Sequence, residues 1–300
     1  MGSEPNLTDP YPLSAVTDVP IAALQAPADW QTIDFISDLH LHASDSATFG
    51  AWQHYLQRTP AEAVFILGDL FDAWIGDDAV SLAPDALLDA PNDRFENRCA
   101  RVLGEAAGRL ALFFMHGNRD FLVGKKAWGI DAVVNPVATS LPDLCNITLL
   151  DDPCALTFAG TRWLLSHGDA LCLDDVDYLK FRHQVRGDAW QQAFLARPLA
   201  DRQQIAGELR AQSRQQQARR MRAGEPFFDI DTGAARKWLQ GADAAILIHG
   251  HTHRPAVHDL GDGLRRIVLS DWDAAASPPR LEVLRLAASA AGEWQRIKLA

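Results

Sequence analysis

The sequence has 300 residues, an ordinary apolar content of 48% and a formal net charge of −11 at pH 7. This length can bury one large core, and the negative charge argues against general binding to nucleic acid phosphates. No apolar run approaches the ~18 residues that a membrane-spanning helix needs, and the N-terminus lacks the pattern of a secretory signal, so a cytoplasmic protein is expected.

The N-terminal part of the chain divides into a leader and an α/β unit. Residues 1–29 hold five prolines and no sustained period, which predicts an extended or disordered leader. Residues 30–300 are expected to form one domain, which begins with an apolar run that ends at Ile36 and predicts a strand. A helix over 48–58 and a strand over 64–67 follow, and this order opens an α/β unit.

The first predicted strand ends in a pair of potential metal ligands. Asp38 and His40 are two residues apart, so their side chains share one face of an extended chain. Alone, this spacing is a weak signal. Four further apolar runs end in the same manner, and the polar residues that follow them include Asp69, Asn118, His167, His251 and His253.

The remaining elements vary in how clearly they are predicted. Residues 92–110 predict a helix that leads into the strand 112–115, and apolar runs at 163–165 and 246–248 predict two more strands. Between 123 and 158 the pattern is weak, with short strands expected near Val133 and over 147–150. Strands near 281–286 and 294–299 complete the sheets. The four cysteines show no C-x-x-C spacing, which favours free thiols over a zinc site or disulfides.

Residues 176–222 differ in composition from the rest of the chain. Nine arginines and one lysine face four acids, a local charge of 10 − 4 = +6, which leaves −17 for the remainder. Helical spacing of the apolar residues predicts an inserted helical cap over about 174–224. A solvated helix face is the simpler interpretation of any one arginine. The cap as a whole is expected to bring cations over an anion-binding centre.

The polar strand ends together suit two metal ions. Seven candidate ligands that mix carboxylate, amide and imidazole are too many for one ion, and Asp69 is the natural bridge between two. A set without thiolate suits Mn²⁺, with Fe, Zn, Co or Ni also possible. Two such ions acidify a shared water and clamp phosphoryl oxygens, which predicts hydrolysis of a phosphate ester or anhydride.

These strand ends resemble the motifs of the calcineurin-like metallophosphoesterases over about residues 32–272. The motifs are, in chain order, D-x-H at 38–40, G-D at 68–69, G-N-R-D at 117–120, H-G-D at 167–169 and G-H-T-H at 250–253. The resemblance implies an α/β (α+β) fold, a β-sandwich flanked by helices. It also implies two Mn²⁺ ions, one held by Asp38, His40, Asp69 and His253. The second would be held by Asp69, Asn118, His167 and His251.

Three segments, 68–78, 116–122 and 249–255, resemble the UDP-2,3-diacylglucosamine pyrophosphohydrolases of the lipid A pathway. This resemblance implies attack of water on the α-phosphorus, which releases UMP and 2,3-diacylglucosamine 1-phosphate at the cytoplasmic face of the inner membrane. The residues that it implies for the chemistry are Asp69, Asn118, Arg119 and His251. The substrate contacts that it implies are Asn118, Arg119, Asp175, Ser213, Gln217, Arg220 and His251.

The chain departs from the usual residues of these proteins at four positions in the sequence. Gln217 and Arg220 stand where asparagine and lysine are usual, which keeps donor character, and Asp72 replaces a usual glutamate. Arg119 stands where many phosphoesterases have histidine. It stays protonated at neutral pH, so it is expected to bind phosphate and not to act as an acid.

Two other functions stay open from the sequence. One is a phosphodiesterase or nucleotidase of the same fold with another substrate. Arg119 and the loop 74–78 disfavour this function. The other is a metal-free binding or scaffolding protein, which the presence of all seven candidate ligands disfavours.

Overall fold

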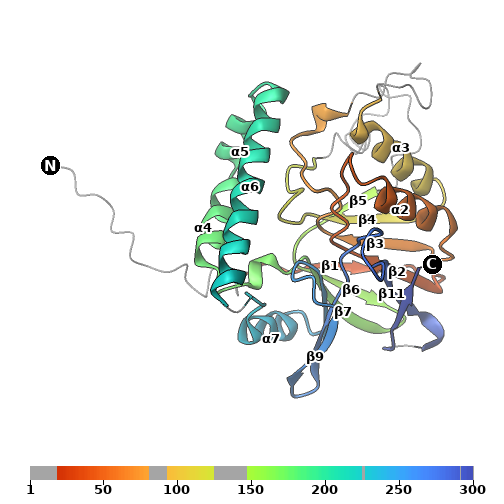
Figure 1. Ribbon diagram of the computed structural model, residues 1–300. Helices are drawn as coiled ribbons and strands as arrows, with labels where there is room; N and C mark the ends of the chain where they lie inside the picture. The colour runs from red at the N-terminus through yellow and green to blue at the C-terminus, as the bar shows by residue number, and fades with distance from the viewer. Residues whose placement is uncertain (1–18, 81–92, 125–146, 225–226, 291, 300) are drawn as a thin grey trace.

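The computed structural model describes residues 19–80, 93–124, 147–224, 227–290 and 292–299, and within them two six-stranded sheets pack face to face (Figure 1). Sheet 1 has the order β12-β11-β2-β3-β4-β5 and sheet 2 the order β1-β6-β7-β8-β10-β9. The strands of sheet 1 are β2 (Thr32–Ile36), β3 (Ala63–Leu67), β4 (Ala111–Met115), β5 (Ile147–Leu150), β11 (Glu282–Ala287) and β12 (Gln295–Lys298). Those of sheet 2 are β1 (Ala22–Gln25), β6 (Cys154–Phe158), β7 (Thr161–Ser166), β8 (Ile246–His249), β9 (Ala256–Gly261) and β10 (Leu264–Val268).

The core between the sheets follows the two-residue period of the strands. Phe35, Phe65 and Phe113 occupy matching positions on the parallel strands β2, β3 and β4. Their rings stack across the sheet with centroid distances of 5.0 and 4.4 Å. Burying one such ring contributes about 1.5–3 kcal/mol, so this row anchors the three strands whose ends carry candidate ligands.

Helices cover the outer face of each sheet. On sheet 1, α2 (Ser46–Arg58) and α3 (Phe95–Ala107) pack residues such as Trp52 and Leu103 against Ile66 and its neighbours. On sheet 2, α7 (Thr232–Gly241) packs Trp238 against Leu164. The sandwich with helices on both outer faces confirms the fold expected from the family resemblance.

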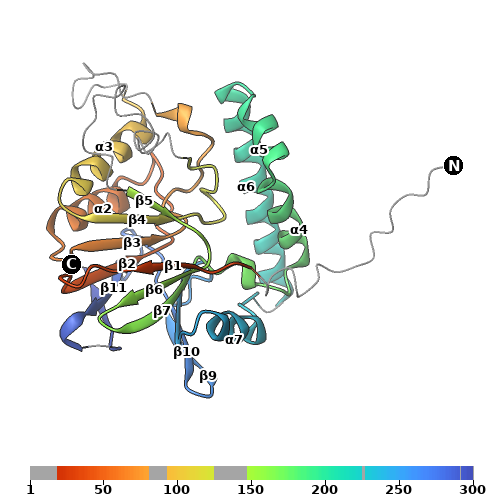
Figure 2. The ribbon, with the colours of Figure 1, turned by 180° about the vertical axis from the view of Figure 1, so that it is seen from behind.

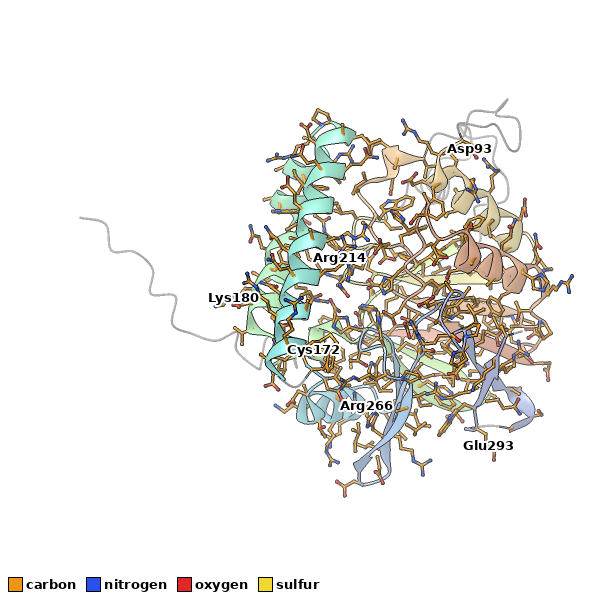
Figure 3. The ribbon with its side chains drawn as sticks, in the orientation of Figure 1. Asp93, Cys172, Lys180, Arg214, Arg266 and Glu293 are labelled. Carbon is orange, nitrogen blue, oxygen red and sulfur yellow. The ribbon has the colours of Figure 1, made fainter. Side chains whose placement is uncertain are left out.

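Three helices stand as a column beside the sandwich (Figures 1 and 2). They are α4 (Val176–Val185), α5 (Asp188–Leu195) and α6 (Leu199–Ala223), and we keep the name helical cap for them. Arg214 extends from α6 towards the sandwich, whereas Lys180 lies on the outer side of the cap (Figure 3). An aromatic contact joins the cap to the sandwich, because Trp190 stacks on Phe194 and also meets Phe121 after β4.

Short 3₁₀ turns complete the described elements at Asp77–Ala79, Asp169–Leu171 and Ala288–Ala290. Among the described residues no helix is both long and apolar enough to cross a bilayer. Cys99, Cys154 and Cys172 are free and buried, as expected of structural thiols, and Cys145 lies outside the described residues.

The boundary predicted for the leader, at residue 29, is wrong. Residues 22–25 form β1, an edge strand that pairs in parallel with β6 (Figure 2). The strand has only four residues, which alternate between half-buried and exposed. Such a short pattern could not be distinguished from the proline-rich stretch before it. The strand expected near Val133 lies outside the described residues.

Candidate metal centre

The carboxyl ends of β2, β3, β4, β7 and β8 bring the seven candidate ligands together at one end of the sandwich. β2, β3 and β4 are parallel neighbours, as are β7 and β8, so their ends open onto the same edges of the two packed sheets. His253 Nε2 lies 3.1 Å from His40 Nε2 and 3.3 Å from Asp38 Oδ1. This forms one half of the cluster.

The second half of the cluster converges on Asn118. Its Oδ1 lies 3.0 Å from His167 Nε2 and 3.0 Å from His251 Nδ1. Asp69 stands between the halves, with Oδ2 3.9 Å from His40 Nδ1 and Oδ1 3.8 Å from His167 Nε2. One carboxylate oxygen therefore faces each half, which is the arrangement that a bridging ligand needs.

Many of the candidate ligands adopt a backbone conformation that side chains usually avoid. Of the eight described non-glycine residues with positive φ, five are the candidate ligands Asp38, His40, Asp69, His251 and His253, with φ between 47° and 66°. Each costs about 1–3 kcal/mol, and such strain persists where the surrounding structure enforces it. The loops are therefore shaped to direct these side chains inward at the expense of local stability.

Hydrogen bonds hold three of the candidate ligands in fixed orientations. Asp38 Oδ2 accepts from Ser37 Oγ at 2.7 Å and from the His251 backbone N–H at 2.9 Å. His167 Nδ1 lies 2.9 Å from the Leu67 carbonyl oxygen, so Nδ1 donates its hydrogen there and Nε2 is the ring nitrogen that faces the cluster. Asp69 Oδ1 accepts from the Arg119 backbone N–H at 2.8 Å.

Asp120, which the sequence reasoning did not assign, ties two ligand loops together. Its buried carboxylate accepts backbone N–H groups of Gly117 at 2.8 Å, Leu70 at 2.8 Å and Asp69 at 3.3 Å. It thereby fixes the loop after β3 against the loop after β4. Its position two residues after Asn118, on the same face of an extended chain, is the signal that could have found it.

The electrostatics of the cluster suit divalent cations. Burial raises the pKa of Asp69 to about 7, and it lowers the pKa of His40 to about 3 and that of His251 to about 4. These imidazoles are neutral at pH 7 and available as ligands. Burial acts against a charged His167, yet Asp69 and Asp38 raise its pKa to about 9. The closely packed carboxylates therefore favour the binding of positive charge at this site.

The residues present fit metal ions. Asp38 Oδ1 and His40 Nδ1 are buried, and neither has a hydrogen-bond partner among the residues that the structure describes. Two sets of side chains could each hold an ion, namely Asp38, His40 and His253, and Asp38, Asp69 and His167. Mixed oxygen and nitrogen donors suit Mn²⁺, Fe, Co, Ni or Zn and do not select among them.

Arg119 supplies a cation beside this cluster. Its side chain is half-buried, and its charge is close enough to act on Asp69 and His40. Within the part of the chain that the structure describes, its guanidinium makes no hydrogen bond or ion pair. A free guanidinium next to a metal centre is suited to bind a phosphate oxygen.

Helix α4 contacts the ligand loops directly. Tyr178 stacks on the ring of His251 at a centroid distance of 6.0 Å and donates its hydroxyl to the buried Asp169. Arg182 Nε also donates to Asp169 at 2.8 Å, and Arg186 donates to the Gly117 carbonyl at 2.9 Å. The cap thus touches both the loop that carries His167 and the loop that carries Asn118, contacts that the sequence did not reveal.

The loop 74–78 fastens helix α6 to the sandwich. Arg202 on α6 is almost fully buried and binds Asp78 through both of its terminal nitrogens. Arg210, two turns further along, pairs with Asp72. Asp77 accepts the Trp74 indole N–H at 3.0 Å and the Gly124 N–H at 2.9 Å, which holds the loop in place.

The expected cap contacts lie on two helices. Ser213, Gln217 and Arg220 are all on α6, beyond the two arginines that fasten it. Asp175 is the N-cap of α4 and accepts the Tyr178 N–H at 3.2 Å, so it has a structural role of its own. The Arg220 guanidinium lies 3.5 Å from the ring centroid of Phe228.

Comparison with known proteins gives a consistent result. The family described as calcineurin-like phosphoesterase matches residues 31–255. A protein of Cellvibrio japonicus named UDP-2,3-diacylglucosamine hydrolase is 40% identical over 243 residues, which are 79% of this chain and 90% of that protein. Proteins with the same name from Stenotrophomonas maltophilia and Ralstonia nicotianae are 37% and 38% identical over 275 and 282 residues. These matches cover 89% and 90% of this chain and 98% and 96% of those proteins.

Proposed function

The chain belongs to the calcineurin-like phosphoesterase family, and from this premise we propose that it hydrolyses the pyrophosphate bond of UDP-2,3-diacylglucosamine. Water attacks the α-phosphorus, the bond from that phosphorus to the bridging oxygen breaks, and the products are UMP and 2,3-diacylglucosamine 1-phosphate. The observation that carries the proposal is Asp69, whose two carboxylate oxygens face the two halves of the cluster.

We assign the cluster to two divalent cations and propose Mn²⁺ for both. Asp38, His40, Asp69 and His253 would hold the first cation. Asp69, Asn118, His167 and His251 would hold the second. When bound, such a pair of cations lowers the pKa of a water and neutralises charge on the phosphoryl oxygens.

Arg119 binds the diphosphate in this proposal. Its guanidinium, which has no hydrogen-bond or ion-pair partner among the described residues, can hold two phosphate oxygens at once. Its backbone N–H is bonded to Asp69, so the cation is placed relative to the proposed bridge. Because the leaving group is a sugar phosphate, it needs little protonation and no separate general acid.

The helical cap supplies the remaining substrate contacts in this proposal. Ser213, Gln217 and Arg220 follow one another at helical spacing on α6, and Asp175 lies at the start of α4. The local excess of positive charge in the cap suits a diphosphate and an anionic bilayer surface. We therefore place the protein in the cytoplasm, in peripheral contact with the inner membrane that holds its acylated substrate.

Incubation of the purified chain with UDP-2,3-diacylglucosamine and Mn²⁺ tests this function. Release of UMP supports the proposal. Cleavage of a simple phosphodiester without UMP release supports a different phosphoesterase of the same fold. Failure of both reactions, with no metal retained, supports a binding protein.

Two variants of one loop sharpen the assignment. Asp69→Asn should abolish UMP release, because the proposed bridge loses its charge. Asp72→Asn makes the same chemical change three residues away, where the charge lost is that of the ion pair with Arg210. It should retain turnover, and equal loss in both variants would contradict the role of Asp69.

A further inference from the structure

A buried acid lies behind one of the candidate ligands. Asp271 follows β10 and is 9% exposed, and its Oδ2 is 3.9 Å from His253 Nδ1. The opposite ring nitrogen, Nε2, faces the cluster and is 3.3 Å from Asp38 Oδ1. The imidazole of His253 therefore stands between the cluster on one side and a carboxylate on the other.

The carboxylate of Asp271 is held in place from two directions. Arg280 Nε lies 3.2 and 3.1 Å from its two oxygens. Asp273 pairs with the same arginine at 3.0 Å and forms an isolated backbone bridge with it. On the other side, the Trp272 N–H donates to the Asp38 carbonyl oxygen at 3.1 Å. The segment 271–273 is thus joined to the loop that carries the first candidate ligands.

We propose that Asp271 is a positioning residue for His253, an inference that rests on the metal centre proposed above. Asp271 accepts the Nδ1 hydrogen, directly or through one water, which leaves the Nε2 lone pair directed at the cation. The 3.9 Å separation is longer than a direct hydrogen bond, and one bridging water or a small ring rotation closes it.

A comparison with His167 supports this assignment. Its Nδ1 also faces away from the cluster and meets a fixed acceptor, the Leu67 carbonyl oxygen, at 2.9 Å. The same tautomer is thus selected at one end of the cluster by a backbone carbonyl and at the other by a carboxylate. A carboxylate makes the ring a stronger donor to a cation than a carbonyl does.

A purely structural role for Asp271 makes a different prediction. Arg280 is 45% exposed, and an ion pair with an exposed arginine contributes little to stability. If the pairing with Arg280 were its whole purpose, the loss of Asp271 would resemble the loss of Asp273, which contacts the same guanidinium. If Asp271 acts on His253, only its own loss affects a cation.

The experiment is a Mn²⁺ titration of the full-length chain after removal of metal with a chelator. Free Mn²⁺ is followed by its electron paramagnetic resonance signal, and the wild type is compared with Asp271→Ala and Asp273→Ala. The wild type should bind two ions. Asp271→Ala should bind one of them about 10- to 100-fold more weakly, which is the usual effect of removing such an outer partner. Asp273→Ala should match the wild type.

The outcomes separate this inference from the proposed function. If the wild type binds no Mn²⁺, the metal centre and this inference both fail. If the wild type binds two ions and Asp271→Ala binds both with unchanged affinity, only the role of Asp271 fails. Equal weakening at both ions, or equal weakening in both variants, also overturns it. Thermal unfolding of the metal-free variants shows that each is folded.

Discussion

Replacing Gly68 with alanine should displace residues of the candidate metal centre. Gly68 connects β3 to Asp69 and has a φ of +87°, and a Cβ at this position would lie 2.5 Å from His167 Nδ1 and 2.7 Å from Gly117 Cα. Real Cβ atoms essentially never approach other atoms closer than 3.0 Å, so the His167 ring must move by about half an ångström. The Gly117 backbone is no easier to displace, because Asp120 holds it.

The expected loss follows from this displacement. A misplacement of about 1 Å in a catalytic centre costs roughly 100-fold in rate, so half an ångström corresponds to roughly tenfold. The positive φ adds about 1–2 kcal/mol of destabilisation, which is independent of the collision. We therefore expect Gly68→Ala to lower kcat for UMP release at least tenfold and to weaken Mn²⁺ binding, with a reduced free energy of unfolding in urea.

A second glycine provides the matched control. Gly160, in the turn between β6 and β7, has a φ of +75°, but a Cβ there meets nothing within 4 Å. Gly160→Ala should lose the same 1–2 kcal/mol of stability and keep its kcat and its metal. If Gly68→Ala retains wild-type turnover, or if Gly160→Ala loses as much activity, the collision with His167 does not control the centre.

Four other predictions follow from the structure. Arg119→Met should lower kcat by about 100-fold or more while two Mn²⁺ still bind, because a charge that stabilises the phosphoryl group is lost; unchanged kcat would contradict this. Arg202→Leu should cost about 1–3 kcal/mol in urea unfolding and raise KM, because the buried Ile75 carbonyl loses its donor and α6 loosens. Arg266 hydrogen-bonds to Asp229 and lowers the pKa of that carboxyl to about 2. Stability from this pair is therefore complete above about pH 4 and is lost as the pH falls through 2, a loss that Asp229→Asn should diminish in acid unfolding. Chelation should abolish UMP release and added Mn²⁺ should restore it, whereas activity that survives complete removal of metal would exclude the proposed centre.

The sequence predicted which residues meet, because their spacing reflects strand geometry. Each candidate ligand follows an apolar run by one to a few residues, and strands that are parallel neighbours end at the same edge. Asp38 and Asp69 could therefore be grouped before any fold was known. The pairing of β7 with β8 was not predicted, because no spacing in the sequence encodes which distant strands become neighbours.

The supporting contacts could not be predicted in the same way. Asp271 and His253 are brought together by the parallel pairing of β8 and β10, and no period in the sequence encodes that distance. The contact through which Arg202 holds α6 against the sandwich could not be predicted for another reason. Its helix is polar on all sides, so a buried arginine could not be distinguished from the solvated ones.

The most direct test of the two-cation centre is anomalous diffraction at the manganese edge from crystals grown with Mn²⁺. Our account predicts two peaks in each chain, one beside His40 and His253 and the other beside His167 and His251, with the Asp69 carboxylate between them. A single peak that Asp69 does not contact, or density for metal anywhere except these side chains, would contradict it.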